Sequence, residues 1–394
     1  MRENVQLRVV TDLLSSYNSK EPLQQYLKTR FRENKQFGSR DRRFYQEVIY
    51  AYYRCRPLWQ QLNTEAALLF SQFLTTSSCT PFAAYLMERI PALPDLTPLW
   101  GNAVHDKVAF LEECKLASWD HYFPFQESVS DAINLPEFLF HHLLQPSFFI
   151  RISKQRISHS LELLKQKSIA FTASGACVSL QANTDVAGIL TDSYYEVQDI
   201  SSQQTLSLFN LKGNERVWDC CCGAGGKSLM LLDEYPDIEL YCSDKRQSIL
   251  DNLMARSNKY NVKPEAVQCL NLEAADNTLH FNKRPLTTGS FDTILCDVPC
   301  TGSGTWSRSP EHLSHFESLE LQAYALRQEA IVKRVLPYLK PGGTLVYITC
   351  SVYKEENEGM VEKIAALGLT PKLKTYFSGA AQGGDTLFGA VFKK

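Results

Sequence analysis

Apolar residues recur at helical spacing through the first third of the chain. One apolar stripe covers residues 5–14. A second lies over 44–52, where Phe44, Val48, Ile49 and Tyr52 follow the spacing i, i+4, i+5, i+8. Such spacing is typical of helices that bury one face. The pattern therefore predicts a helical domain over residues 1–125.

A shorter and mixed pattern follows. Residues 147–153 (SFFIRIS) and 176–182 (ACVSLQA) read as strands, and 158–169 (SHSLELLKQKSI) reads as a helix between them. We predict a small α/β linker domain over 126–205.

From residue 206 to 394 the alternation of strand and helix becomes regular. Apolar strand-like runs occur at 215–221, 238–244, 266–272, 291–299 and 342–351. Helical patterns begin at Leu229 and occupy 248–260 and 317–339, and a terminal hairpin is expected within 370–394. Regular alternation predicts a doubly wound parallel sheet, so this part reads as an α/β, Rossmann-like domain.

Reactive side chains stand where two of these strands end. In the stretch 291–305 (FDTILCDVPCTGSGT), Asp297 and Cys300 come just after an apolar run, and Cys350 ends the following strand. Ligands bind at the carboxyl edge of such sheets, and consecutive strands joined by a crossover are often neighbours. A single buried Cys is usually a small hydrophobe. Two thiols beside a carboxylate at this edge favour chemistry.

A glycine-rich turn follows the first strand of this domain. It does not match a phosphate-binding loop, because Cys221 stands where that motif needs glycine. It does not match a dinucleotide fingerprint either, because Ser228 replaces the last glycine. Asp219 precedes the turn, and Asp244 ends the second strand, where a carboxylate can hold two ribose hydroxyls. The combination predicts a nucleotide-like cofactor.

Charge is unevenly distributed. The chain has a net charge of −2, yet its first sixty residues hold twelve Lys and Arg against six acids. A basic stretch, 28–44, interleaves these cations with phenylalanines. We predict that phosphates of RNA contact this stretch, although a solvated surface loop would have the same composition. The predicted RNA-binding residues are Arg30, Arg32, Arg40, Arg42 and Arg43.

The twelve cysteines include three consecutive ones and no C-x-x-C pair, which disfavours both a disulfide framework and a zinc cluster. No metal is expected. Without a signal peptide or a long apolar run, we expect a reduced, cytoplasmic protein with no membrane association.

The motifs together resemble the RNA 5-methylcytosine methyltransferases of the RsmB/NOP2/Sun type. The matching stretches are VQDISSQ, DCCCGAGGKS, YCSDKR, DVPCTGSGTWSRSPE and LKPGGTLVYITCSVYKEENE. Resemblance is strong over 145–394 and weaker in the amino-terminal third, where GSRDRRFYQEVIYAYYR is similar to the NusB-like helical domain of ribosomal-RNA members. The fold implied is a NusB-like helical domain, a small RRM-like α/β domain and a Rossmann-like class I methyltransferase domain.

The resemblance also implies a cofactor and roles for individual residues. It places S-adenosylmethionine on Cys221, Cys222, Gly223, Ala224, Gly225, Gly226, Lys227, Asp244, Asn271 and Asp297. It assigns nucleophilic attack to Cys350, product release to Cys300 and a contact with the cytosine ring to Asp297. Asn271 stands where the family usually has an acid, and the family's Pro in the glycine turn is missing.

The expected activity is methylation of cytosine carbon 5 in RNA, with 16S ribosomal RNA preferred, by a monomeric enzyme. Transfer RNA is the alternative substrate, and a catalytically weak RNA-binding assembly factor is the alternative class. DNA cytosine methyltransferases attack with the Cys of their Pro-Cys motif, so Cys300 is a rival nucleophile to Cys350. Lys227 is expected to steady Asp297 or the cofactor carboxylate, unless it is simply a solvated lysine at a helix start.

Overall fold

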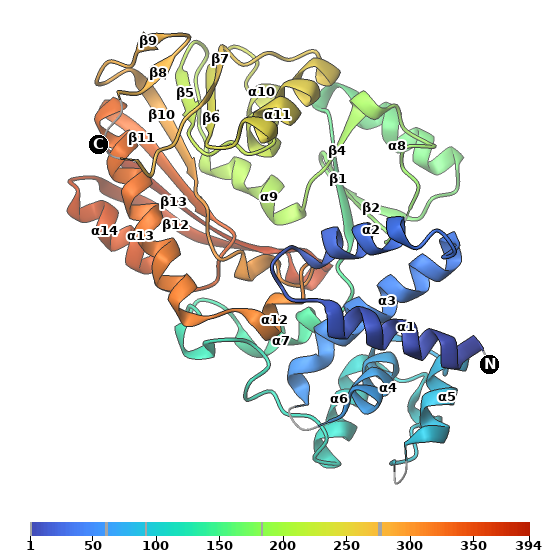
Figure 1. Ribbon diagram of the computed structural model, residues 1–394. Helices are drawn as coiled ribbons and strands as arrows, with labels where there is room; N and C mark the ends of the chain where they lie inside the picture. The colour runs from blue at the N-terminus through green and yellow to red at the C-terminus, as the bar shows by residue number, and fades with distance from the viewer. Residues whose placement is uncertain (1, 60–61, 91–92, 183, 275–277) are drawn as a thin grey trace. The chain divides into compact units, whose positions relative to one another are not determined.

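The computed structural model, drawn in Figure 1, describes residues 2–59, 62–90, 93–182, 184–274 and 278–394. The chain forms two compact units. The amino-terminal unit consists of Met1–Glu127, Asn134–Gln145 and Trp306–Ser318. The carboxy-terminal unit consists of Ser128–Ile133, Pro146–Thr305 and Leu319–Lys394. Each unit therefore contains a short segment whose neighbours in the sequence belong to the other unit.

The amino-terminal unit is helical, as predicted. Its helices are α1 (Arg2–Ser16), α2 (Leu23–Glu33), α3 (Ser39–Cys55), α4 (Thr64–Thr75), α5 (Pro81–Arg89), α6 (Val104–Glu113), α7 (Leu135–Leu143) and the short α12 (His312–His315). Helix α4 is apolar on nearly all sides and packs against α3, α5 and α6, which makes it the centre of this unit. The predicted stripe of α1 is only partly correct: Leu7, Val10 and Leu13 are buried, but Val5 remains 48% exposed.

The segment Trp306–Ser318 is held in the amino-terminal unit by aromatic and polar contacts. The Trp306 ring lies 5.1 Å from Phe123, and its side chain is 1% exposed. Arg54 donates to the Ser307 carbonyl at 3.2 Å, and Glu311 accepts from the backbone N–H of Leu23 at 3.0 Å. Because the chain leaves the carboxy-terminal unit right after Thr305, the stretch following Cys300 ends inside the helical amino-terminal unit.

The small α/β region contains a four-stranded antiparallel sheet in the order β2-β3-β1-β4. Its elements are β1 (Phe148–Ile152), α8 (Ile157–Gln166), β2 (Phe171–Ser174), β3 (Cys177–Leu180) and β4 (Tyr195–Val197). Ile150, Val178 and Leu164 belong to its apolar core, which joins helix α8 to one face of the sheet. The sequence predicted β1, α8 and β3. It did not reveal β2 and β4, which are short and only weakly alternating.

The large sheet has seven strands in the order β12-β13-β11-β10-β5-β6-β7. Five of these strands run parallel to one another. They are β5 (Arg216–Asp219), β6 (Glu239–Asp244), β7 (Ala266–Cys269), β10 (Phe291–Asp297) and β11 (Leu339–Thr349). The predicted hairpin, β12 (Thr370–Ser378) and β13 (Thr386–Lys393), adds antiparallel strands beside β11. A two-stranded ribbon, β8 (His280–Phe281) and β9 (Arg284–Pro285), lies outside this sheet.

Helices cover both faces of the large sheet (Figure 1). They are α9 (Ile200–Gln204), α10 (Gly226–Glu234), α11 (Gln247–Tyr260), α13 (Ser318–Val335) and α14 (Glu358–Ala366). One apolar cluster joins the sheet to Ile331 of α13 and Met360 of α14, and the other joins it to Leu231 of α10 and Leu250 of α11. These two layers confirm the α/β, doubly wound fold.

Two boundaries differ from the predictions. Helix α13 ends at Val335, and Leu336–Tyr338 form a 3₁₀ turn because Pro337 has no N–H to donate. Strand β11 then starts at Leu339, before the two glycines. The division into domains at 1–125, 126–205 and 206–394 stays a prediction, since the compact units do not test which parts fold independently.

Within the residues that the structure describes, no helix is both long and apolar enough to cross a bilayer.

Candidate active site at the carboxyl edge of the large sheet

Four neighbouring parallel strands bring three carboxylates and a thiol to one edge. Asp219 ends β5, Asp244 ends β6 and Asp297 ends β10, while Cys350 comes directly after β11. The register aligns Asp297 of β10 with Ile348 of β11, as expected for adjacent strands. The predicted neighbourhood of these two strands is confirmed.

The two cysteines meet at this edge. The Sγ atoms of Cys300 and Cys350 lie 3.2 Å apart, and the backbone N–H of Cys350 points to the Cys300 sulfur at 3.3 Å. The hydrogen bond with Cys350, together with burial, raises the pKa of the Cys300 thiol well above its ordinary value. The raised pKa favours the protonated form of the Cys300 thiol.

An ion pair stands beside the thiols. Lys227 Nζ lies 2.8 Å from Asp297 Oδ2, and the two side chains are 11% and 31% exposed. Burial alone would lower the pKa of Lys227, but the Asp297 carboxylate outweighs that effect and the pKa is raised. Of the two partners expected for Lys227, the structure shows Asp297.

The glycine-rich turn connects β5 to α10 through left-handed backbone. Gly223 has φ +52° and Gly225 has φ +85°. A Cβ on Gly225 would come within 2.9 Å of the Leu253 side chain, whereas a Cβ on Gly223 or Gly226 would meet nothing within 4 Å. Gly225 is thus required for packing, and the other two leave open space beside the turn. Helix α10 starts at Gly226, three residues before the predicted start.

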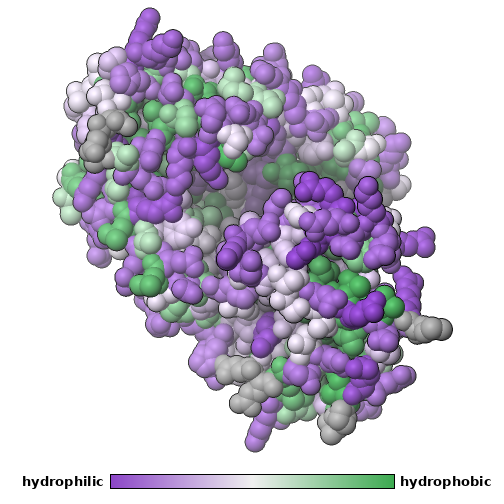
Figure 2. All heavy atoms as spheres, viewed as in Figure 1, coloured by the Kyte–Doolittle hydropathy of each residue, from purple (hydrophilic) through white to green (hydrophobic). Residues whose placement is uncertain are grey.

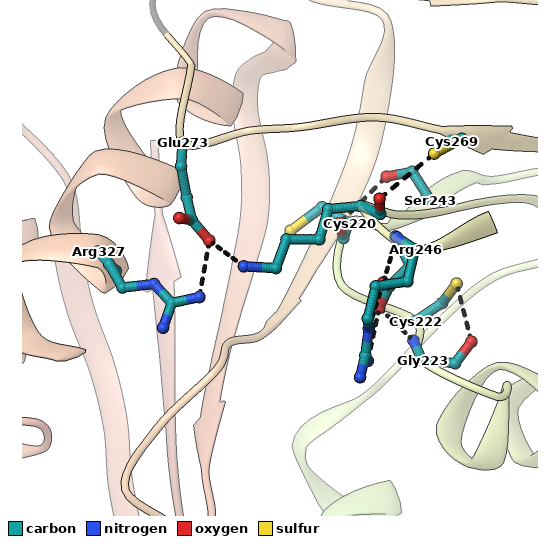
Figure 3. A network of polar contacts seen from close by, with 10 residues as sticks. Cys220, Cys222, Gly223, Ser243, Arg246, Cys269, Glu273 and Arg327 are labelled. Atoms are coloured by element: carbon teal, nitrogen blue, oxygen red, sulfur yellow. Dashed lines mark hydrogen bonds and ion pairs between the residues drawn. The ribbon is translucent and has the colours of Figure 1, made fainter. Parts of the chain in front are cut away.

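Asp244 is linked to this turn. Its Oδ2 accepts from the Gly223 N–H at 3.2 Å, and its Oδ1 accepts from the backbone N–H and the Nε of Arg246, at 2.9 and 3.1 Å. Figure 3 shows Arg246 beside the Cys222–Gly223 turn. A 7% exposed carboxylate with these donors is fixed in place at the strand end.

Asn271 lies two residues beyond β7 and is exposed. Its Oδ1 accepts from the Glu273 N–H at 3.1 Å. Glu273 is itself bound to Lys245 and Arg327, each at 2.9 Å, and Figure 3 shows Glu273 facing Arg327. The contact of Asn271 with a cofactor stays a prediction.

The predicted RNA-binding arginines lie on α2 and α3 of the amino-terminal unit. Arg30 pairs with Glu33 at 3.5 Å and Arg43 pairs with Glu47 at 2.9 Å, while Arg42 donates to the Phe37 carbonyl. Arg32 and Arg40 are exposed. Hydrophilic side chains dominate the visible surface over α2 (Figure 2).

Two buried acids at this edge were not predicted as site residues from the sequence. Asp219, only 1% exposed, accepts from Ser228 Oγ at 2.6 Å, and burial raises its pKa to about 7. Glu356, with no exposed surface, accepts hydrogen bonds from Thr301 and Gln328. The sequence signal that could have indicated a polar network around Glu356 is the hydroxyl residue that follows each cysteine, Thr301 after Cys300 and Ser351 after Cys350.

All twelve cysteines are free thiols. In the described parts of the chain, no three His, Cys, Asp or Glu side chains gather in a way that could hold a metal ion.

Comparisons with known proteins agree with this arrangement. The fold is that of a Rossmann-like methyltransferase: NSun6 from Pyrococcus horikoshii, solved with SFG, aligns over 70% of this chain and 99% of its own, with TM-score 0.56 and 15% identity. A methyltransferase homologue protein from Pyrococcus horikoshii aligns over 66% and 90%, with TM-score 0.54 and 20% identity. At such identities the likeness concerns the fold.

Residues 206–378 match the family model described as 16S rRNA methyltransferase RsmB/F. Ribosomal RNA small subunit methyltransferase B of Shewanella oneidensis is 29% identical over 57% of this chain and 51% of its own length. The enzyme of that name from Xanthomonas campestris is 32% identical over 42% of this chain and 37% of its own. The chain thus spans about half the length, or less, of these relatives, and the predicted family resemblance is confirmed for its methyltransferase domain.

Proposed function

We propose that the protein transfers the methyl group of S-adenosylmethionine to carbon 5 of a cytosine in RNA, with 16S ribosomal RNA as the substrate. The observation that carries the proposal is the pair of thiols 3.2 Å apart next to the Lys227–Asp297 ion pair. The names of the curated relatives support ribosomal RNA as the substrate. The monomeric state and the cytoplasmic location stay predictions.

The residues present fit the proposed methyl donor. The open space beside Gly223 and Gly226 allows a ligand to approach the backbone, and the fixed carboxylate of Asp244 suits two ribose hydroxyls. S-adenosylmethionine supplies an electrophilic methyl carbon when it is bound. The other assigned residues of the turn, from Cys221 to Lys227, would then contact it mainly through their backbone.

Carbon 5 of cytosine is a poor nucleophile, so the enzyme must activate the ring. The Cys350 thiolate adds to carbon 6, forming a carbon–sulfur bond and moving the electron pair of the 5,6 double bond toward carbon 5 and the N3 end of the ring. Because the raised pKa of Cys300 leaves the proton on that thiol, Cys350 is the better nucleophile.

Asp297 and Lys227 stabilise the charge that develops on the cytosine ring. As electrons reach N3, the ring nitrogen takes up a proton that the Lys227 ammonium passes on through the Asp297 carboxylate, and N3 returns this proton when the ring is restored. After carbon 5 has gained the methyl group, its hydrogen leaves as a proton to solvent water, the carbon–sulfur bond breaks and the Cys350 thiolate departs. Cys300 is adjacent to Cys350 and keeps its own proton, so it positions the acceptor of the carbon 5 proton.

Bisulfite sequencing tests the reaction and the substrate together. A deletion strain should lose one 5-methylcytosine in 16S ribosomal RNA, and the wild-type gene, but not Cys350→Ala, should restore it. Transfer RNA sequenced in the same experiment is the matched control. Unchanged ribosomal RNA with a lost transfer-RNA mark would move the substrate to transfer RNA, and no lost mark in either would contradict the activity.

The methyl donor is tested separately at Asp244. Asp244→Ala removes an acceptor of hydrogen bonds from the ribose, so S-adenosylmethionine should bind about 1–3 kcal/mol more weakly in calorimetry. Equal affinity for wild type and variant would contradict the placement of the cofactor. Asp251→Ala serves as a control, because Asp251 is an exposed acid on α11 bound to Gln247.

A further inference from the structure

A buried polar network joins the two segments that carry the cysteines. Thr301 follows Cys300, and Ser351 follows Cys350; their hydroxyls lie 3.3 Å apart. Ser303 Oγ lies 3.1 Å from Ser351 Oγ and accepts from the backbone N–H of Val352 at 2.9 Å. Thr301 is 8% exposed, and Ser303 and Ser351 have no exposed surface. The two segments therefore touch through side chains that solvent does not reach.

Glu356 follows Cys350 in the chain and binds the segment that carries Cys300. Its Oε1 accepts from the backbone N–H of Thr301 at 3.0 Å, and its Oε2 accepts from the Thr301 hydroxyl at 2.6 Å. Gln328 of α13 donates to the same Oε1 at 2.8 Å and to the Pro299 carbonyl at 3.1 Å. Both residues flanking Cys300 are thus fixed by one carboxylate and one amide.

The carboxylate has only neutral partners among the contacts of the described residues. Its partners are Thr301, Gln328 and Ser351, and burial raises the pKa of Glu356. The Tyr347 hydroxyl donates to the backbone carbonyl of Glu356 instead. A buried carboxylate without a cation costs free energy, and apolar side chains of similar size commonly stabilise such positions as well or better. Fold stability alone therefore does not account for a glutamate here.

We propose that Glu356 is a positioning residue, which holds the segment Pro299–Thr301 against Cys350 so that both thiols reach one cytosine ring. Glu356 touches neither sulfur; it acts through Thr301 and Gln328. The inference rests on the proposed function for its purpose, but the geometry it concerns exists without RNA or methyl donor.

Oxidation by diamide measures that geometry directly. Two thiols 3.2 Å apart should form a disulfide quickly when diamide removes two electrons and two protons from them. In Glu356→Ala the Thr301 N–H loses its acceptor, so the Cys300–Cys350 disulfide, followed by peptide mass spectrometry, should form at least about tenfold more slowly. Glu356→Gln should restore the rate, because the amide oxygen still accepts from the Thr301 N–H.

Two controls separate positioning from general loosening. Glu358→Gln changes a neighbouring carboxylate that binds Ser130 and Tyr376 instead, and it should oxidise like the wild type. The buried Cys220 and Cys296, whose sulfurs lie 3.6 Å apart, should cross-link faster only in a variant that has loosened the whole domain.

The catalytic readout is the separation of kcat from KM. Because a displacement of about 1 Å can cost about 10²-fold in rate, Glu356→Ala should lose up to that factor in kcat, with unchanged KM for RNA and unchanged affinity for S-adenosylmethionine. Oxidation of Glu356→Ala at the wild-type rate, or a Gln variant as poor as Ala, would overturn the proposal. Should the Ala variant fail to fold, Thr301→Val, which lacks only the bridging hydroxyl, must slow the same disulfide. An intact oxidation pattern in a protein that methylates no RNA would reject the proposed function alone.

Discussion

The two thiols have different roles in the proposed reaction, so removing each one should stop the reaction at a different step. At the residue scale the proposed reaction uses one thiol that bonds to the ring, one that stays protonated and an ion pair that carries the charge. The sequence supplied the identities, Asp297, Cys300 and Cys350, because strand ends and turn residues are local signals. It left open whether Lys227 pairs with Asp297 or with the cofactor carboxylate, because Lys227 and Asp297 lie seventy positions apart and only the fold brings them together.

Substitution of each cysteine distinguishes their roles. Cys350→Ala should show neither methyl transfer nor a covalent complex, since no bond to carbon 6 forms. Cys300→Ala should accumulate an RNA–protein adduct that survives denaturing gel electrophoresis and depends on S-adenosylmethionine, because release fails after transfer. The double variant should form no adduct. An adduct with Cys350→Ala that vanishes with Cys300→Ala would reverse the two roles.

Asp219 predicts a pH dependence of stability. Its raised pKa of about 7 means that between about pH 4 and pH 7 the folded state keeps a proton that the unfolded state has lost. The free energy of unfolding therefore falls as pH rises through this window, by up to about 1.4 kcal/mol per pH unit from this residue.

Denaturant unfolding of Asp219→Asn tests this dependence. The variant cannot ionise at this position, so its stability relative to wild type should increase from pH 4 to pH 7 and level off above. A constant difference between the two proteins over that range would show that Asp219 does not titrate there.

At the scale of single elements, the turn between β5 and α10 combines two requirements. Gly225 fits a left-handed conformation against Leu253, and the next residue, Gly226, has ordinary backbone and free space. Pattern and composition predicted the turn and the strands of the parallel sheet. They could not predict β2 and β4, or the early end of α13, because short, half-exposed segments take their structure from neighbours rather than from their own periodicity.

The two adjacent glycines should therefore respond differently to a methyl group. Gly225→Ala should lower the free energy of unfolding by about 1–2 kcal/mol or more, because an L-residue in the left-handed region is strained and the Cβ meets Leu253. Gly226→Ala should fold with nearly wild-type stability. Thermal or denaturant unfolding of the two variants measures the difference, and similar losses in both would contradict the conformation of the turn.

At the scale of the whole molecule, the basic stretch 28–44 and the candidate site belong to different units. The basic stretch lies in the amino-terminal unit, whereas the thiols and the glycine turn lie in the carboxy-terminal unit. The asymmetry was visible in the sequence, since it depends only on composition. Which arginines are already paired was not: Arg30 and Arg43 have acidic partners on their own helices.

RNA affinity should reveal which arginines contact phosphates. Replacing both Arg32 and Arg40 by Gln should make the log–log dependence of RNA affinity on salt shallower by about 1–2 units, and S-adenosylmethionine affinity should not change. Arg89→Gln, at an arginine of the same unit that pairs with Glu65, should leave the slope unaltered. A wild-type slope in the double variant would mean that this stretch is only a solvated surface.

The exchange of segments between the units has a practical consequence for dissecting the chain. A fragment that starts at Pro146 would lack Ser128–Ile133, whose Ser130 donates its N–H to the Val352 carbonyl, only two residues after Cys350. The same fragment would carry Trp306 and Leu313 stripped of their apolar surroundings, and large apolar side chains newly exposed promote aggregation. Limited proteolysis would not separate the two units with a single cut, because the chain passes between them more than once. The amino-terminal unit thus supplies the apolar surroundings of residues 306–318, and soluble expression calls for the full chain.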